Sequence, residues 1–209
     1  TEYEWFEEGL DEEQCNCCIR LLMEILEPTW SVMSKTPYIR DFLFSSNSKI
    51  PATIGHAEFL AKEHHGLQKW FPERAHDHDM TPENVRLFLE EKDHAMREIE
   101  ALYDLARKGI PGLKAEFNAL LSAQFEMFRL YVEQFRAVGR VYVLIKSAVP
   151  NGDGRAVFEA LEELRRFEER LKEYRFPAFP YPASVLLCYE KLHFFRLDAE
   201  KEAKRLQLG

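Results

Sequence analysis

Apolar residues recur at helical spacing along residues 113–149, the longest regular pattern in the chain. Steps of four and three residues along this segment meet only one polar side chain, Gln124. At a rise of 1.5 Å per residue, such a helix would be about 55 Å long. We expect a bend at Gly139, because glycine weakens a helix by about 1 kcal/mol relative to alanine. The pattern predicts one long helix with a nearly continuous apolar row: Leu113, Phe117, Leu120, Phe128, Tyr131, Phe135, Val138, Tyr142, Ile145 and Val149.

Shorter amphipathic segments on both sides of this helix predict further helices. Asp11 is a suitable N-cap for a helix that ends before Pro28, and residues 28–53 form an irregular connector with prolines and a serine-rich run. Apolar residues lie on nearly every side of the chain between Val185 and Leu197, which predicts a central position for the last helix. The remaining helices are expected over 53–71, 82–108, from the turn at 151–154 to about 174, and over 183–206. We therefore predict an all-α single domain over residues 1–209, a helical bundle of about five to six helices built around one long central helix at about 113–149.

Acidic residues are concentrated at the beginning of the chain. The net charge is −8, but seven acidic residues and no basic residue occur among the first fourteen, which leaves 29 acidic against 28 basic residues elsewhere. Residues 1–10 are predicted to be a solvated acidic tail; the alternative is a contact with the basic residues Lys201, Lys204 and Arg205 of the last helix. A nearly neutral body argues against nucleic acid or an anionic membrane as a partner.

The cysteines do not form the pattern of a secreted disulfide framework. Cys15, Cys17 and Cys18 lie within one predicted helical turn, where they cannot bond to each other, and Cys188 is distant. We interpret them as packing thiols in a reducing compartment, so the predicted location is cytoplasmic. The longest aliphatic run, Val141 to Ile145, is too short to span a bilayer. The chain begins without Met, so we expect either a processed product or a fragment of a larger protein.

Two E-x-x-H motifs, at 91–94 and 190–193, each place a carboxylate and an imidazole one turn apart on a helix face. Glu63 is expected at the same height as Glu91 across one predicted turn, and Glu168 at the same height as Glu190 across another. Glu168 occupies an otherwise apolar position. The pattern resembles ferritin-like proteins, which hold two iron or manganese ions with such motifs and one further Glu from each of two other helices. The resemblance implies a dimetal carboxylate oxidase with the metal ligands Glu63, Glu91, His94, Glu168, Glu190 and His193.

Chance and simple pairing offer another interpretation of the same motifs. About one E-x-x-H is expected at random in a chain with this many Glu and His residues. Glu91 and His94 could pair with each other or face water, and Glu190 and His193 could form buried hydrogen bonds to the central helix, for instance to Gln124. A further alternative is a sensory bundle that binds zinc or haem, with His64, His65, His94 and the His-Asp-His-Asp loop at 76–79 as candidate zinc ligands.

The favoured hypothesis is a helical interaction or accessory module without chemistry of its own and without a cofactor. The chain has no phosphate-binding loop, no nucleophile triad signature and no basic face. Its partner would be another protein or a missing neighbour domain, and a homo-oligomer is possible. Aromatic residues expected to be exposed, Tyr3, Trp5 and Trp70, are the predicted contact points. The alternatives are the di-iron or di-manganese oxidase and the zinc- or haem-binding sensor.

Overall fold

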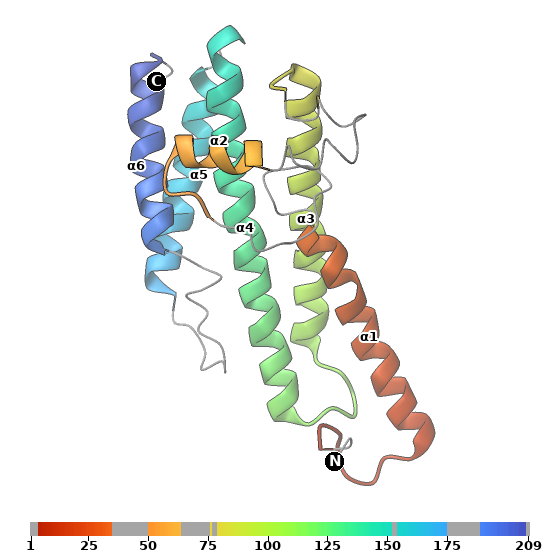
Figure 1. Ribbon diagram of the computed structural model, residues 1–209. Helices are drawn as coiled ribbons and strands as arrows, with labels where there is room; N and C mark the ends of the chain where they lie inside the picture. The colour runs from red at the N-terminus through yellow and green to blue at the C-terminus, as the bar shows by residue number, and fades with distance from the viewer. Residues whose placement is uncertain are drawn as a thin grey trace.

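The structure is a computed structural model that describes residues 4–34, 50–63, 76, 79–151, 154–174 and 189–207. Within these ranges the regular elements are helices, arranged as a bundle around the longest of them (Figure 1). The prediction of an all-α bundle with one long central helix is therefore confirmed. The helices are α1 (Glu12–Ser34), α2 (Ile54–Glu63), α3 (Pro82–Lys108), α4 (Ala115–Asn151), α5 (Gly154–Glu173) and α6 (Tyr189–Arg205).

Helix α4 is the centre of the bundle. It packs most extensively on α3, then on α5 and α6, so three neighbours surround its second half. Between Leu130 and Ala148 the buried side chains fall on nearly every face of the helix, whereas Leu120 in the first half is 44% exposed. The apolar row thus extends into a largely enclosed segment because other helices cover most of its sides. No helix in the described ranges is long and apolar enough to cross a membrane.

Gly139 has a packing role in α4. The helix is continuous from Ala115 to Asn151 and passes through this glycine. A Cβ atom added there would lie 2.9 Å from Cζ of Phe88 on α3, closer than real Cβ contacts allow. The missing side chain therefore lets the Phe88 ring pack directly against the backbone of α4.

The turn between α3 and α4 is formed by residues suited to it. Gly109 ends α3 with φ 74°, and Gly112 follows with φ 87°, a region that favours glycine. The Asn118 side chain accepts a hydrogen bond from the Ile110 amide at 2.7 Å and donates to the carbonyl of Leu113 at 2.9 Å. These bonds fix the geometry with which α3 and α4 pack against each other.

The beginning of the chain is attached to this turn, which corrects the prediction of a solvated tail. Phe6 is buried and forms an antiparallel bridge with Leu113. The amide of Lys114 donates to the carbonyl of Trp5, and the amide of Glu7 donates to the carbonyl of Gly112, both at 2.9 Å. Glu4, Glu7 and Glu8 are exposed, but Phe6 is apolar and anchors the backbone between them.

Helix α1 is longer than predicted. Asp11 and Gln14 form the expected reciprocal N-terminal cap, with backbone to side-chain hydrogen bonds of 2.9 and 2.8 Å. The helix does not end before Pro28 but continues to Ser34, so the irregular connector predicted over 28–53 begins later. Burial of Val32, which continues a row with Cys18 and Ile25 at intervals of seven residues, stabilises this extension against the proline. Cys18 is 1% exposed, as expected of a packing thiol.

Helix α6 lies at the edge of the bundle, and the prediction that it is central was wrong for the described residues. It packs on α5 and α4, and its buried residues Leu192, Phe195, Ala199 and Ala203 form a single row. Phe194 is 58% exposed and Leu197 is 44% exposed. The chain offers a second apolar side to α6, and Phe194 and Leu197 on this side remain exposed although α2 also contacts α6. The predicted beginning of this helix, over 183–188, lies outside the described residues.

Helix α2 is short and crosses the bundle at its surface (Figure 1). Its first amide, on Ile54, donates to Asp198 of α6 at 2.8 Å, so a residue 144 positions away caps this helix. Lys146 of α4 pairs with Glu58 at 2.6 Å. The part of this helix predicted over 64–71, including His64, lies outside the described residues.

Candidate functional site

A cluster of charged side chains joins α5 to α6 around Glu168. This carboxylate is 5% exposed, at the apolar position noted in the sequence. His193 Nδ1 lies 2.6 Å from one carboxylate oxygen, and Arg196 Nε donates to the other. Arg196 also donates to Glu200 at 2.7 Å. Glu168 is therefore buried with partners for both of its oxygens, and its position in the apolar row is explained by pairing between two helices.

The electrostatic surroundings favour the ionised form of the two carboxylates, Glu168 and Glu200. Burial by itself raises the pKa of Glu168, but hydrogen bonds from Arg196 and His193 outweigh it, so the pKa lies below the usual value. Burial also raises the pKa of Glu200, but hydrogen bonds from Arg165 and Arg196 outweigh burial, so this pKa too lies below its usual value. The carboxylate at Nδ1 orients the half-exposed imidazole of His193.

The other candidate ligands are not gathered at this cluster. Glu91 lies 2.5 Å from the buried Lys92, and His94, half-exposed, lies 3.4 Å from Glu98. Glu190 is exposed at the start of α6. Neither E-x-x-H motif therefore shows a contact between its own Glu and His. Figure 1 shows why the two motifs also stay apart: α3 and α6 lie on opposite sides of α4.

The structure consequently brings together two of the six predicted metal ligands, Glu168 and His193. The side chain of Glu63, at the end of α2, lies outside the described residues, as do His64, His65, Asp77 and His78 of the proposed zinc site. Within the described ranges no group of three or more His, Cys, Asp or Glu side chains is placed to hold a metal ion. His76 lies 2.9 Å from Asp79 at the surface. Metal binding stays a prediction.

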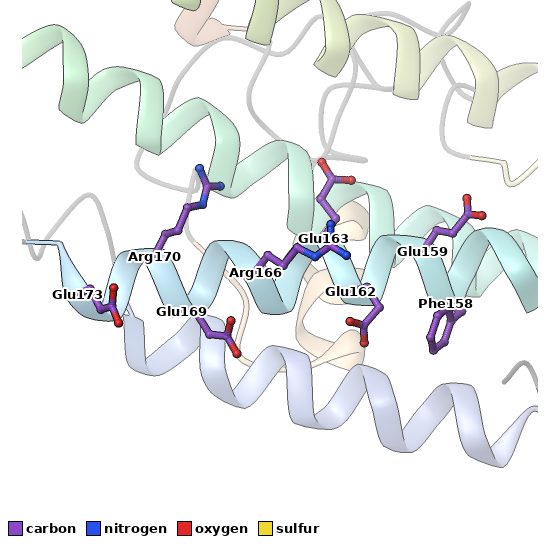
Figure 2. Close-up of a pocket in the computed structure, with 8 residues that line it drawn as sticks. All are labelled: Phe158, Glu159, Glu162, Glu163, Arg166, Glu169, Arg170 and Glu173. Atoms are coloured by element: carbon purple, nitrogen blue, oxygen red, sulfur yellow. The ribbon is translucent and has the colours of Figure 1, made fainter.

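A shallow groove of about 750 Å³ follows the outer surface of α5 (Figure 2). In Figure 2, Glu163 and Arg170 point toward α4, whereas Glu162 and Glu169 point toward α6. Glu163 pairs with Arg136 of α4, and Arg170 pairs with Glu133. These charges are therefore largely occupied in joining α5 to α4. The residues that line the groove are Phe158, Glu159, Glu162, Glu163, Arg166, Glu169, Arg170 and Glu173.

Two exposed apolar rows are the surface features that the sequence interpretation missed. On α1, Ile19, Met23 and Leu26 are 44%, 41% and 37% exposed, and their spacing of four and three places them on one face. On α6 the exposed row consists of Phe194 and Leu197. The available signal was an excess of apolar residues on each helix beyond those needed for one buried row.

The aromatic contact points predicted from the sequence are only partly described. Trp5 is 54% exposed, as expected, and its ring lies 5.6 Å from that of Phe117 near the turn between α3 and α4. Tyr3 and Trp70 lie outside the described residues. Among the described residues, exposed large apolar side chains form rows on α1 and α6, and others lie elsewhere: Trp5, Phe59, Leu105, Leu120 and Phe158.

Comparison of the chain with protein-family models, curated proteins and solved structures found no match. No relative therefore indicates a substrate, cofactor or partner. The function has to be argued from the surfaces and contacts of this molecule.

Proposed function

We propose that the protein is a helical interaction module that binds a protein partner through the exposed apolar row of α1. The observation that carries this proposal is the exposure of Ile19, Met23 and Leu26 on one face of a helix. The opposite side of α1 is already anchored, because Cys18, Ile25 and Val32 are buried. α1 thus has two apolar sides, and the described part of the chain covers only one of them.

Single exposed hydrophobic residues are common on soluble proteins and require no explanation. Three large ones on successive turns of one face form a contiguous strip, which is the arrangement that a partner helix covers in helix-to-helix recognition. Complete burial of such side chains contributes about 1.5–3 kcal/mol each, and the half that is still exposed offers about 1 kcal/mol per residue. A partner that covers this strip would therefore gain a useful part of its binding free energy there.

The dimetal oxidase is the weaker candidate. Its ligand set requires Glu190 to face a bundle interior, and Glu190 is exposed. Glu168, which would be a central ligand, is shared between Arg196 and His193, and a guanidinium competes with a metal ion for the carboxylate. The clustering of two of the six residues is better explained as an ion-pair network between α5 and α6.

Site-specific photo-crosslinking in the cells that produce the protein tests the proposal. A photoreactive amino acid at position 23 would lie in the apolar strip, and the same amino acid at the exposed polar position Glu100 of α3 is the matched control. We expect an adduct of defined mass from position 23, absent from position 100 and lost when Ile19 and Leu26 are replaced by Gln. No adduct from position 23, or the same adducts from both positions, would contradict the proposal.

A further inference from the structure

The exposed row of α6 is bordered by basic residues. Lys191, Phe194, Leu197, Lys201 and Lys204 follow one another at intervals of three or four residues, so they share one helix face. All five are exposed. The opposite face of α6 is buried against α5 and α4. This surface, called the basic face of α6 below, is an apolar centre with Lys191 beside the exposed Glu190 at one end and with Lys201 and Lys204 at the other.

The exposed row of α1 has the opposite charge around it. Arg20 is the one exposed base on this helix within the described residues, and a shallow depression of about 600 Å³ beside the first turns is lined mainly by acidic and polar side chains. The apolar strip lies between this acidic border and the side of α1 that packs on α3. We call the apolar strip together with its acidic border the acidic face of α1. Its exposed acidic residues are Glu12, Glu13, Glu24 and Glu27.

The two faces are complementary in both charge and apolarity, but they cannot meet within one molecule. Figure 1 places α1 and α6 on opposite sides of the α3 and α4 pair. The notion that acidic residues of the first segment pair with Lys201 and Lys204 is therefore excluded within one chain. The same pairing remains available between two chains.

We propose that the partner of the acidic face of α1 is the basic face of α6 from a second copy of this chain. The inference rests on the proposed function, because it names the partner of the same apolar strip. Contact between two copies of α1 would place acid against acid in both the parallel and the antiparallel arrangement. Contact between two copies of α6 would bring together two faces that each carry three exposed lysines and one exposed acid, Glu190, so both would be net positive. Like-charge contacts oppose both alternatives. The complementary pair is the combination that joins apolar to apolar and acid to base.

This contact is heterologous, since it joins two different surfaces. Each bound copy still presents one unused α1 face and one unused α6 face, so association continues into open chains unless the rotation closes a ring. One pair of helices buries less than the roughly 1,600 Å² of a standard interface. We therefore expect weak association that increases with protein concentration and decreases with salt, because the bordering charges are exposed and screened.

Sedimentation velocity of the whole chain with two half-blocked variants tests this geometry. In the first variant Ile19 and Met23 are replaced by Gln, which removes the apolar strip of α1. In the second, Phe194 and Leu197 are replaced by Gln, which removes that of α6. A control replaces Leu105 and Leu120, each 44% exposed on α3 and α4, by Gln. Gln keeps helix propensity and charge, and circular dichroism verifies folding of each variant.

The wild type and the control are expected to grow beyond the monomer between about 5 μM and a few hundred μM, and to return toward the monomer in about 0.5 M salt. Each half-blocked variant alone is expected to stay monomeric. Their equimolar mixture is expected to form dimers and nothing larger, because one variant retains the α6 face and the other retains the α1 face. The dimer is the result that only a heterologous α1-to-α6 contact gives.

A wild type that is monomeric throughout, a half-blocked variant that still associates alone, or a mixture that stays monomeric would each overturn the inference. Crosslinking separates this failure from failure of the proposed function. An adduct at position 23 of twice the chain mass supports the second copy as partner. An adduct of another mass would support the proposed interaction module but would refute self-association.

Discussion

Helices α4 and α6 both carry apolar residues on more than one side, yet their surroundings in the bundle differ. In α4 the residues between Leu130 and Ala148 are buried on nearly every face. In α6 one face is buried, and Phe194 on the other is 58% exposed. The number of apolar faces is a property of the sequence, but the number of covered faces depends on the neighbours. α4 has three packed helices around its second half, and α6 lies at the edge.

Apolar residues therefore have different roles on α4 and on the outer sides of α1 and α6. Apolar residues on the sides of α4 stabilise the fold, because burying them drives folding. Apolar residues on the outer sides of α1 and α6 contribute little within one chain and are available for association. Substitutions on the two kinds of surface test this difference.

The largest difference in stability is expected between substitution of a buried phenylalanine of α4 and substitution of an exposed phenylalanine of α6. Phe135 of α4 is 1% exposed and its ring lies 4.8 Å from that of Tyr131. Phe135→Ala should lower the free energy of unfolding by about 3–5 kcal/mol, since it removes buried apolar surface and leaves a cavity. Phe194→Ala should change it by less than about 0.5 kcal/mol at low protein concentration. Chemical denaturation of both variants measures the difference, and equal losses would place α6 in the core.

A smaller loss is expected at the ion-pair network between α5 and α6. Glu168→Gln keeps the shape of the side chain but removes the charge that Arg196 and His193 contact. The free energy of unfolding at pH 7 should fall by about 1–2 kcal/mol. The matched control is Glu159→Gln on the same helix, whose partner Arg155 is exposed, and it should change little.

The same network predicts a direction for the pH dependence. The folded pKa values of Glu168 and Glu200 lie below their usual value of 4.5, so their contribution to stability is present above that pH. It is lost as the pH falls through the lower folded values. Urea denaturation between pH 7 and pH 3 should therefore show a steeper acid loss in the wild type than in Glu168→Gln. Parallel curves would show that Glu168 is not held ionised by its partners.

The smallest of these effects is expected at Gly139. Alanine there gains about 1 kcal/mol of helix propensity, but its Cβ would lie 2.9 Å from Phe88 Cζ, and overpacking costs about 1–3 kcal/mol. We expect a net loss of about 1 kcal/mol in thermal unfolding. Gly55→Ala on α2, where the nearest atom lies 3.9 Å away, should be neutral or stabilising. A stabilised Gly139→Ala would mean that α3 and α4 are not packed closely at this point.

Local signals in the sequence were sufficient for the main elements. The periodicity of 113–149 predicted α4, Asp11 was the N-cap of α1, and the helix predicted over 82–108 is α3. These features depend on residues a few positions apart, so their physics is contained in short stretches of sequence.

Features that depend on distant residues were predicted poorly. Burial of Val32 extends α1 beyond Pro28. Phe6 pairs with Leu113, so the segment that was predicted to be a solvated tail is attached to the bundle. Glu168 was recognised as misplaced, but its partners come from a helix 25 and 28 residues further along the chain. Such outcomes depend on which helices become neighbours, and spacing along one helix does not contain that information.

Hydroxyl-radical footprinting at several protein concentrations tests the central claim most directly, because it measures the solvent accessibility of individual side chains. At low concentration we predict rapid oxidation of Met23 and Phe194 and protection of Phe135. At high concentration Met23 and Phe194 should become protected together, while Leu105 and Leu120 stay reactive. Protection of Phe194 at every concentration, or unchanged reactivity of both Met23 and Phe194 as the concentration rises, would contradict the account.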